Sequence, residues 1–218
     1  MRILAATLLA ASALCVGGCA TGIQSGAKPA GSSVRIELPA SLGSGVYIGN
    51  GVIITAAHVV ADAPRPADGG LPTVRLISDQ GDVQDGEVLW LNKDYDIAAV
   101  RPKNARRFLE ADLACRDVVV GEPLVAEGNP VGVQFISMHG YVSGAPRAFL
   151  PNWKSGFVTD MTVISGMSGG GIYDAGGEVV GITVGAFDPH GVAGQAAQGG
   201  MGFAVPSSVI CGLLGRGA

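Results

Sequence analysis

Three polar residues, each next to an apolar or glycine-rich run, could together perform nucleophilic catalysis. His58 follows a β-rich run, Asp96 directly precedes the apolar run 97–100, and Ser168 lies in the run 166–170, Gly-Met-Ser-Gly-Gly. A serine hydroxyl becomes a nucleophile when a histidine accepts its proton and a carboxylate orients that histidine. Glycines permit a tight turn whose backbone N–H groups stabilise an oxyanion. The residues therefore predict hydrolysis by a serine nucleophile, in the chain order His, Asp, Ser.

Each of these residues also has an ordinary structural interpretation. A lone histidine is more often structural than catalytic, Asp96 could be a strand-edge charge, and Ser168 could be a simple turn residue. Asp94 competes with Asp96, because it lies two residues away on the same strand face. The apolar run that begins directly after Asp96 favours Asp96. We assign no role to His139 and His190, and three scattered histidines without spaced Cys or Glu residues predict no metal site and no cofactor.

Two other classes of protein compete with this interpretation. Residues 166–170 fit the Gly-x-Ser-x-Gly nucleophile elbow of an α/β-hydrolase, a fold that requires the order Ser, Asp, His. Only fifty residues follow Ser168, and they contain one histidine, so they cannot supply the remaining strands and helices. A catalytically idle double barrel that serves as a binding module is the alternative outside the enzymes, and the sequence leaves it open.

The elements that must position these residues are short strands. Apolar runs alternate with turn signals, and an Asn-Gly turn within residues 49–51 predicts a hairpin. A serine after Pro206 is expected to cap a C-terminal helix. The expected strands are 45–48, 52–55, 74–78, 87–91 and 97–101 in the first half, and 118–120, 124–127, 134–142, 156–159, 171–173, 179–184 and 202–205 in the second.

Two sets of about six strands around a connector predict an all-β fold of two packed six-stranded antiparallel β-barrels. Periodicity alone would also allow a sandwich. We expect the first barrel in residues 34–105, the connector in 106–115, and the second barrel with a short C-terminal helix in 116–218. The cleft between the barrels would hold the three polar residues.

The composition is typical of a folded domain. Hydrophobic residues make up 48% and charged residues 15% of the 218-residue chain, which argues against disorder. The net charge of -4 gives no support to nucleic-acid binding. The 35 glycines follow no strict period, which excludes collagen and indicates many turns.

The N-terminal residues 1–18 are typical of a signal peptide, with Arg2 before an apolar run that is too short to span a membrane. The ending Val-Gly-Gly before Cys19 resembles the lipobox of bacterial lipoproteins. This resemblance implies lipidation of Cys19 and a membrane anchor, with the periplasmic face of the outer membrane favoured. The alternative is an ordinary secretory signal with a stray cysteine. Residues 19–33 are small and polar and predict a flexible tether.

The motifs around the three polar residues resemble those of the trypsin superfamily of serine proteases. Thr-Ala-Ala-His ends at His58, Asp-Ile-Ala begins at Asp96, and Gly-Met-Ser-Gly-Gly surrounds Ser168. Four further runs are similar to the HtrA/DegP-type branch: 43–46, 128–130, 142–143 and 202–206. The resemblance extends from about residue 41 to residue 208. It implies the double barrel and a serine endopeptidase that acts on proteins or peptides.

The resemblance also implies roles for individual residues. His58 would be the general base and then the general acid, Asp96 would fix its tautomer, and Ser168 would form an acyl-enzyme. The N–H groups of Gly166 and Ser168 would form the oxyanion hole. Residues implied to bind the substrate are Thr162, Val163, Thr183, Val184, Gly185 and Ala186.

Three departures from the family pattern change what is expected. Met167 stands where zymogen-type trypsins carry an aspartate, so activation by a freed N-terminus is not expected. Thr162 stands where trypsin has its specificity aspartate, so we expect cleavage after small or medium apolar residues rather than after Arg or Lys. HtrA-type proteins usually continue into PDZ domains, and we expect none in a chain that ends at Ala218. The oligomeric state and regulation of those proteins are therefore not carried over.

The cysteine count leaves two residues in the mature domain. Cys15 lies in the signal segment and Cys19 would be acylated, which leaves Cys115 and Cys211. Two cysteines in an oxidising compartment could pair, and many trypsin-type proteases join these two regions by a disulfide. The alternative is two buried thiols.

Overall fold

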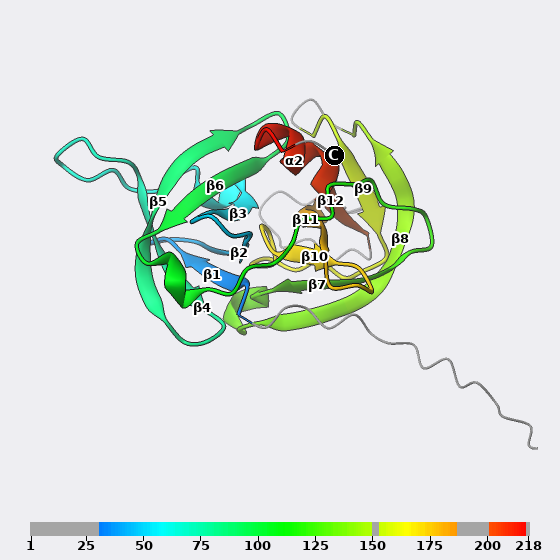
Figure 1. Cartoon of the computed structure of the whole chain (residues 1–218), viewed down its shortest axis with the longest axis horizontal. Helices are drawn as coiled ribbons and strands as arrows, with labels where there is room; N and C mark the ends of the chain where they lie inside the picture. The colour runs from blue at the N-terminus through cyan, green and yellow to red at the C-terminus, as the bar shows by residue number, and fades with distance from the viewer. Residues whose placement is uncertain (1–30, 150–152, 187–200, 217–218) are drawn as a thin grey trace, which may run out of the picture.

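Two closed antiparallel β-barrels stand side by side and make up most of the molecule (Figure 1). The computed structural model describes residues 31–149, 153–186 and 201–216. Each barrel contains six strands, and a short helix follows the last strand. The predicted all-β double barrel is therefore confirmed, and a sandwich is excluded.

The first barrel closes because its first strand pairs with both the second and the fourth. Around the barrel the order is β1-β2-β3-β6-β5-β4. Its strands are β1 (Ser33–Glu37), β2 (Leu42–Tyr47), β3 (Ile53–Ala56), β4 (Thr73–Ser78), β5 (Val83–Asn92) and β6 (Ile97–Pro102).

The predicted hairpin at residues 49–51 joins β2 to β3. Asn50 and Gly51 both have positive φ, and the N–H of Val52 donates to the carbonyl of Gly49 over 3.0 Å. Two left-handed central residues define a type I′ turn, whose twist matches that of a two-stranded hairpin. The strand β3 leads without a loop into the single-turn helix α1 (Ala57–Val60), which carries His58.

The second barrel closes in the same way, with β7 paired to both β8 and β10. The order around it is β10-β11-β12-β9-β8-β7. Its strands are β7 (Pro123–Gly128), β8 (Ile136–Arg147), β9 (Gly156–Thr159), β10 (Gly171–Tyr173), β11 (Val179–Ala186) and β12 (Gly202–Pro206). Two short 3-10 helices, η1 (Ala105–Arg107) and η2 (Pro130–Gly132), lie in the loops.

The two barrels share one apolar cluster, so they pack directly against each other. The cluster combines the core of the first barrel with residues of β10, β11 and β12, among them Tyr173, Ile182 and Phe203. Burial raises the pKa of Tyr173 to about 12, and its hydroxyl lies 3.2 Å from that of Ser32. Ser32 and Ser33, which the sequence analysis assigned to the tether, are buried, and Ser33 is the first residue of β1.

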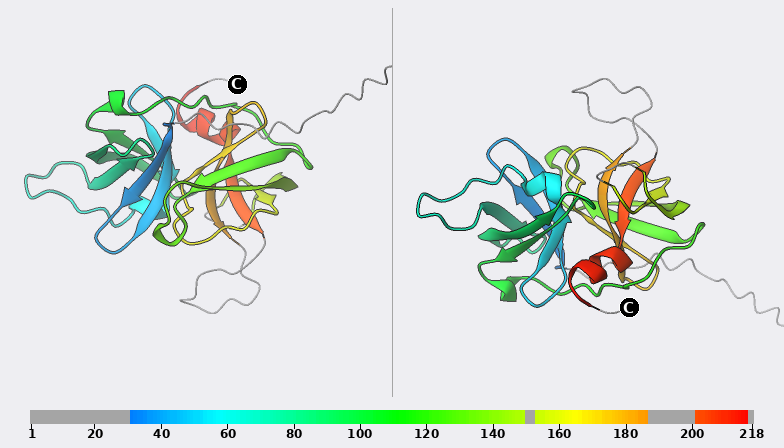
Figure 2. Two further views of the ribbon diagram at one scale, coloured as in Figure 1. Left: turned by 90° about the horizontal axis from the view of Figure 1, so that it is seen from below. Right: turned by 90° about the horizontal axis from the view of Figure 1, so that it is seen from above.

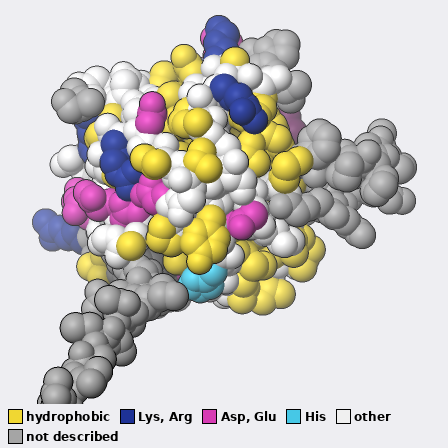
Figure 3. Space-filling view, turned by 90° about the vertical axis from the view of Figure 1, so that its right-hand side faces the viewer, with side chains coloured by type: hydrophobic (Ala, Val, Ile, Leu, Met, Phe, Trp, Pro, Cys, Tyr) yellow, Lys and Arg dark blue, Asp and Glu magenta, His cyan; other side chains and the backbone are white. Residues whose placement is uncertain are grey.

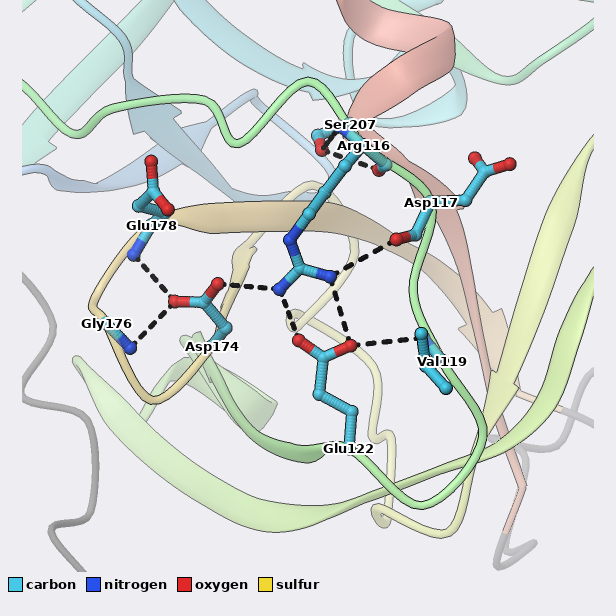
Figure 4. A network of polar contacts seen from close by, with 8 residues as sticks. All are labelled: Arg116, Asp117, Val119, Glu122, Asp174, Gly176, Glu178 and Ser207. Carbon is cyan, nitrogen blue, oxygen red and sulfur yellow. Dashed lines mark hydrogen bonds and ion pairs between the residues drawn. The ribbon is translucent and has the colours of Figure 1, made fainter.

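Arg116, the residue directly after the expected connector 106–115, is bound to two carboxylates of the second barrel (Figure 4). The guanidinium hydrogen-bonds both carboxylate oxygens of Glu122 and lies 2.7 Å from Oδ2 of Asp174. This hydrogen bonding holds the pKa of Glu122 below its usual value and raises the pKa of Arg116. Asp174 also accepts backbone N–H groups from Gly176 and Glu178. The side chain of Arg116 therefore ties the end of the connector to the turn that follows β10.

The last helix, α2 (Ser207–Leu213), lies at the junction of the two barrels in both views of Figure 2. Cys211 of this helix and Cys115 of the connector form a disulfide, with 5.6 Å between their Cα atoms. The predicted serine cap is wrong. Pro206 occupies the N-cap position, and the hydroxyl of Ser207 donates to the carbonyl of Arg116 over 3.1 Å.

The predicted strand at residues 118–120 is also wrong. These valines form no ladder, because the neighbouring β7 already pairs with β8 and β10. Only Val118 is buried, while Val119 and Val120 are 69% and 56% exposed. Figure 3 shows further hydrophobic side chains in separate patches on the side of the second barrel that bears β8 and β9.

Among the residues that the structure describes, no helix is long and apolar enough to span a membrane. The predicted signal peptide, Cys19 and His190 lie outside these residues. The side chain of His139, to which no role was assigned, is exposed on β8.

Candidate active site

His58 and Asp96 lie in direct contact in the first barrel. His58 is on α1, directly after β3, and Asp96 is the last residue before β6. The Nδ1 atom of His58 lies 2.7 Å from Oδ2 of Asp96, and the backbone N–H of His58 donates to Oδ1 over 2.9 Å. The N–H of Ala57 donates to the carbonyl of Asp96 over 2.9 Å. Two hydrogen bonds therefore fix the carboxylate of Asp96, and a third fixes its main-chain carbonyl, against the start of α1.

The two side chains differ in exposure in a way that suits a catalytic pair. The side chain of Asp96 is 11% exposed, while that of His58 is 50% exposed. The carboxylate is thus held inside the protein, and the imidazole presents its free edge to the surface. Asp96 has a φ of 55°, a left-handed conformation that aspartate tolerates better than most residues. In this conformation both carboxylate oxygens of Asp96 contact His58.

Asp94, the competing carboxylate, has a different partner. Its side chain is exposed and pairs with the ammonium group of Lys154 over 2.6 Å. Hydrogen bonding to Asp94 raises the pKa of Lys154. Lys154 precedes β9, so this exposed pair links the two barrels, and the partner of His58 is Asp96.

Ser168 lies in a compact turn between β9 and β10. The N–H of Met167 donates to the carbonyl of Ile164 over 3.0 Å, and Gly166 has a φ of 99°. A four-residue turn with positive φ only at its third residue is type II, which favours glycine there. Gly169 also has positive φ, at 87°, and its N–H donates to the carbonyl of Thr183 over 2.7 Å.

This turn is docked on the first barrel beside the segment that carries His58. The N–H of Ser44 on β2 donates to the carbonyl of Ser168 over 2.8 Å. A Cβ atom on Gly169 would lie 2.1 Å from Oγ1 of Thr55 and 2.9 Å from the nitrogen of Ala56. Thr55 and Ala56 end β3, directly before α1. The segment that carries Ser168 therefore packs against the end of β3, directly before the helix that carries His58.

Two backbone donors beside Ser168 have no acceptor within the part of the chain that the structure describes. Neither the N–H of Gly166 nor that of Ser168 donates a hydrogen bond to any residue within 31–149, 153–186 or 201–216. The carbonyl of Ser165 accepts the N–H of Val131 over 2.8 Å. Because a trans peptide points its N–H and C=O in opposite directions, the N–H of Gly166 points away from Val131.

The residues expected to bind the substrate fall into two groups. Thr183, Val184, Gly185 and Ala186 all lie on β11. The backbone of Thr183 both donates to the carbonyl of Gly170 and accepts the N–H of Gly169, so β11 is attached to the turn that carries Ser168. The hydroxyl of Thr183 is buried without a partner among the described residues.

Thr162 and Val163 precede the turn that carries Ser168. Thr162 is exposed and Val163 is buried. A Cβ atom on Gly202 would lie 2.7 Å from the side chain of Val163, and Gly202 pairs with Ala186 across the ladder. Val163 and the end of β11 therefore both adjoin Gly202, which brings the two groups of expected residues together.

Met167 and the surroundings of His58 complete the site. Met167 stands where zymogen-type trypsins carry an aspartate. Its side chain is fully buried in the apolar cluster of the second barrel. A hollow beside His58 is lined by Ala57, Ala61, Leu91 and Lys93. Sequence reasoning did not single out these lining residues. Among the described residues no three His, Cys, Asp or Glu side chains are grouped to hold a metal ion.

Two buried polar residues at the site were also missed as individual residues. Ser44 and Asn129 are each 1% exposed, and they hydrogen-bond each other behind the turn that carries Ser168. The signal in the sequence was their setting. Ser44 lies between two glycines inside an apolar strand, and Asn129 lies between a glycine and a proline.

A closed double barrel with a paired His and Asp on one barrel and a glycine-rich serine turn on the other defines a trypsin-type protein. Residues 43–182, more than half of the chain, match the family described as the trypsin-like peptidase domain. The chain belongs to this family.

Among individual proteins, the chain is similar to HtrA/DegP-type proteases. It is 31% identical over 181 residues to the periplasmic serine endoprotease DegP of Salmonella typhimurium, which covers 81% of this chain and 35% of that protein. It is 32% identical over 188 residues to the mitochondrial serine protease HTRA2 of Bos taurus, with 83% and 37% covered. The chain thus spans little more than a third of the length of these relatives.

A solved structure has the same fold. That of the HtrA-type protease AlgW with a tripeptide superposes with a TM-score of 0.73 at 23% identity, covering 86% of this chain and 60% of the other.

Proposed function

We propose that the protein is a serine endopeptidase in which His58, Asp96 and Ser168 form the catalytic triad. The observation that carries this proposal is the contact of the imidazole of His58 with the buried carboxylate of Asp96, at the end of the strand on which the Ser168 turn docks. Since a carboxylate only accepts hydrogen bonds, the proton of a neutral imidazole lies on Nδ1. The Nε2 atom is then free to act as a base.

The proposed reaction follows from this arrangement. Oγ of Ser168 attacks the peptide carbonyl carbon while its proton passes to Nε2 of His58, and the carbonyl oxygen becomes an oxyanion. The C–N bond then breaks, and His58 returns the proton to the leaving amine, which leaves an acyl-enzyme. A water molecule repeats the two steps and releases the acid. Asp96 stays ionised and stabilises the imidazolium at each stage.

The oxyanion would be held by the N–H groups of Gly166 and Ser168. Their lack of acceptors among the described residues and the type II turn at Gly166 support this role. Removal of a single donor of this kind from a serine protease lowers kcat by about 10²- to 10³-fold. Each of the two N–H groups would therefore increase kcat by about 10²- to 10³-fold.

The proposed substrates are proteins or peptides cut after small or medium apolar residues. The exposed Thr162 and the end of β11 carry no charged side chain that would bind an arginine or lysine. The backbone of β11 from Val184 to Ala186 would bind the peptide, with Val163 nearby. The apolar lining from Ala57, Ala61 and Leu91 would accept a further substrate side chain beside His58.

We also propose that the protein acts in the periplasm, attached to the outer membrane by lipid on Cys19. The lipobox-like run before Cys19 supports the anchor. The similarity to a relative named as a periplasmic endoprotease supports the compartment. Metabolic labelling with a clickable fatty acid tests the anchor, because label should enter the wild type and be absent from Cys19→Ala.

A fluorophosphonate probe tests the enzymatic function. This reagent phosphonylates only an activated serine, so it should label the wild type and leave Ser168→Ala unlabelled, and casein turnover should disappear in the same variant. Ser165→Ala is the matched control, because its side chain is exposed in the same turn. Wild-type protein that is folded but neither labels nor cleaves would instead support the idle binding module.

A further inference from the structure

Ser44 is a buried serine of the first barrel whose hydroxyl makes three hydrogen bonds beside the turn that carries Ser168. Its Oγ donates to the carbonyl of Gly166 over 2.7 Å. The same oxygen accepts the backbone N–H of Asn129 over 3.0 Å and its side-chain Nδ2 over 2.9 Å. A hydroxyl has one donor and two acceptor sites, so all three are used.

The direction of these bonds is fixed by the partners. Both groups of Asn129 are N–H donors, so they occupy the lone pairs of Ser44 and leave its proton for a carbonyl. The only carbonyl in reach of that proton among the described contacts is that of Gly166. The backbone N–H of Ser44 meanwhile donates to the carbonyl of Ser168. Ser44 therefore holds the turn on both sides of Met167.

Asn129 connects Ser44 to the loop that binds the carbonyl of Ser165, the residue before Gly166. Its Oδ1 accepts the N–H of Phe135 over 3.1 Å, which closes the loop between Asn129 and Phe135. Within this loop Val131 and Phe135 both have left-handed φ, at 44° and 55°. A β-branched residue rarely adopts that conformation unless its surroundings impose it. In this conformation the N–H of Val131 donates to the carbonyl of Ser165.

The two carbonyls on either side of the Gly166 nitrogen are thus both bound. Type I and type II turns differ by rotation of their central peptide, here the peptide from Ser165 to Gly166. Glycine allows both forms, since it accepts positive and negative φ. Rotation would break the bond from Val131 to Ser165 and would point a carbonyl, instead of an N–H, to the oxyanion.

We propose that Ser44, braced by Asn129, is a positioning residue that holds the turn in the form that presents the Gly166 N–H to the oxyanion. This inference rests on the proposed function and adds a residue to it. The hydroxyl comes from the first barrel and the turn from the second. Docking of the barrels would therefore assemble the oxyanion hole as well as the triad.

The test compares Ser44→Ala with Ser78→Ala. Ser78 is a fully buried serine on β4 whose hydroxyl accepts the N–H of Asp82 over 3.0 Å, away from the turn. Both variants lose one buried hydroxyl and should lose thermal stability. Only Ser44→Ala should lower kcat, by about 10- to 100-fold, less than a deleted oxyanion donor because both N–H donors remain and a minority of the molecules keeps the productive turn. KM should stay within about twofold, since the substrate ground state does not need the oxyanion donors.

A peptide aldehyde provides a second measurement, because its adduct with Ser168 places an oxyanion in the same position. Its affinity should fall in Ser44→Ala in parallel with kcat/KM and stay unchanged in Ser78→Ala. The Ser44 inference is overturned if Ser44→Ala keeps the wild-type kcat, or loses no more than Ser78→Ala. If Ser44→Ala does not fold, Asn129→Ala replaces it, and an unchanged kcat in that variant has the same meaning.

The two proposals fail differently. A wild type that the fluorophosphonate does not label overturns the protease function and the role of Ser44 together. A wild type that labels normally, with Ser44→Ala labelling equally fast, overturns the role of Ser44 alone.

Discussion

The carboxylate of Asp96 accepts two hydrogen bonds from His58, one from the backbone N–H and one from the ring. The two oxygens are each used once, at 2.9 Å to the nitrogen of the main chain and 2.7 Å to Nδ1. The main-chain bond fixes the carboxylate relative to α1, and the ring bond fixes the imidazole relative to the carboxylate. The tautomer and the direction of the ring are therefore determined by one side chain that is largely buried.

Asp96→Asn should lower kcat by about 10⁴-fold, because an amide can donate to Nδ1 and stabilise the wrong imidazole tautomer. Folding should be retained, since the amide is isosteric with the carboxylate. The control is Asp94→Asn, which removes a carboxylate two residues away whose partner is the exposed Lys154. That variant should keep its kcat within about twofold. Equal kcat for the two variants, measured on a peptide ester, would contradict the pairing of His58 with Asp96.

The disulfide between Cys115 and Cys211 should stabilise the fold. It closes a loop with a sequence separation of 96 residues that contains the second barrel. Cross-links of this size stabilise proteins by about 2–5 kcal/mol, mainly by restricting the unfolded chain. The double variant Cys115→Ala, Cys211→Ala should lose this amount in urea unfolding, and dithiothreitol should lower the stability of the wild type toward that of the variant. The variant itself should not respond to dithiothreitol.

Acid should remove the stabilisation that Glu122 provides. Hydrogen bonding to Arg116 places the pKa of Glu122 below 4.5 in the folded protein. A lowered folded pKa means that the stabilisation is present above pH 4.5 and is lost as the pH falls through the folded value. Glu122→Gln should therefore be less stable than the wild type at pH 7, and the difference should shrink below pH 4.5.

Glu178→Gln is the control for this effect, because it removes the same charge from an exposed side chain. Its stability relative to the wild type should change little with pH. Urea midpoints measured between pH 2.5 and 7 separate the two variants. A difference between Glu122→Gln and the wild type that persists at the lowest pH would mean that packing, and not ionisation, is responsible.

Local signals in the sequence were sufficient for the hairpin and for most strands. The Asn-Gly turn at residues 49–51 determines its own geometry, since both residues tolerate positive φ. The strand predicted at 118–120 is wrong because three adjacent valines form a strand only where a neighbouring strand has a free edge. Both edges of β7 are already paired, with β8 and β10. The prediction that a serine after Pro206 caps the last helix is wrong for a related reason. Ser207 finds a partner in Arg116, 91 residues away in the chain.

In the candidate site, too, some residues could be predicted from the sequence and others could not. The residue types of the triad and their flanking runs identified candidates, and the structure brings His58 and Asp96 into contact across 38 residues. Ser44 could not be identified from the sequence, because its hydroxyl acts on a carbonyl 122 residues away. A backbone carbonyl has no residue type, so no pattern of side chains reveals that it needs a donor.

Gly169→Ala should destroy the site through a single methyl group. A Cβ atom there would lie 2.1 Å from both the carbonyl of Ser44 and Oγ1 of Thr55, and the φ of 87° disfavours any side chain. The turn would have to move away from β3, which separates Ser168 from the segment that carries His58. Fluorophosphonate labelling should therefore slow by more than about 100-fold, in line with other displaced catalytic groups.

Gly51→Ala separates this displacement from the cost of the backbone alone. Gly51 has a similar φ of 73°, but nothing lies within 4 Å of the added Cβ atom. It should lose about 1–2 kcal/mol of stability from the left-handed conformation and keep the wild-type rate of labelling. If Gly169→Ala labelled as fast as Gly51→Ala, the methyl group would be accommodated without moving Ser168. The close packing of the turn on β3 would then not be what positions the nucleophile.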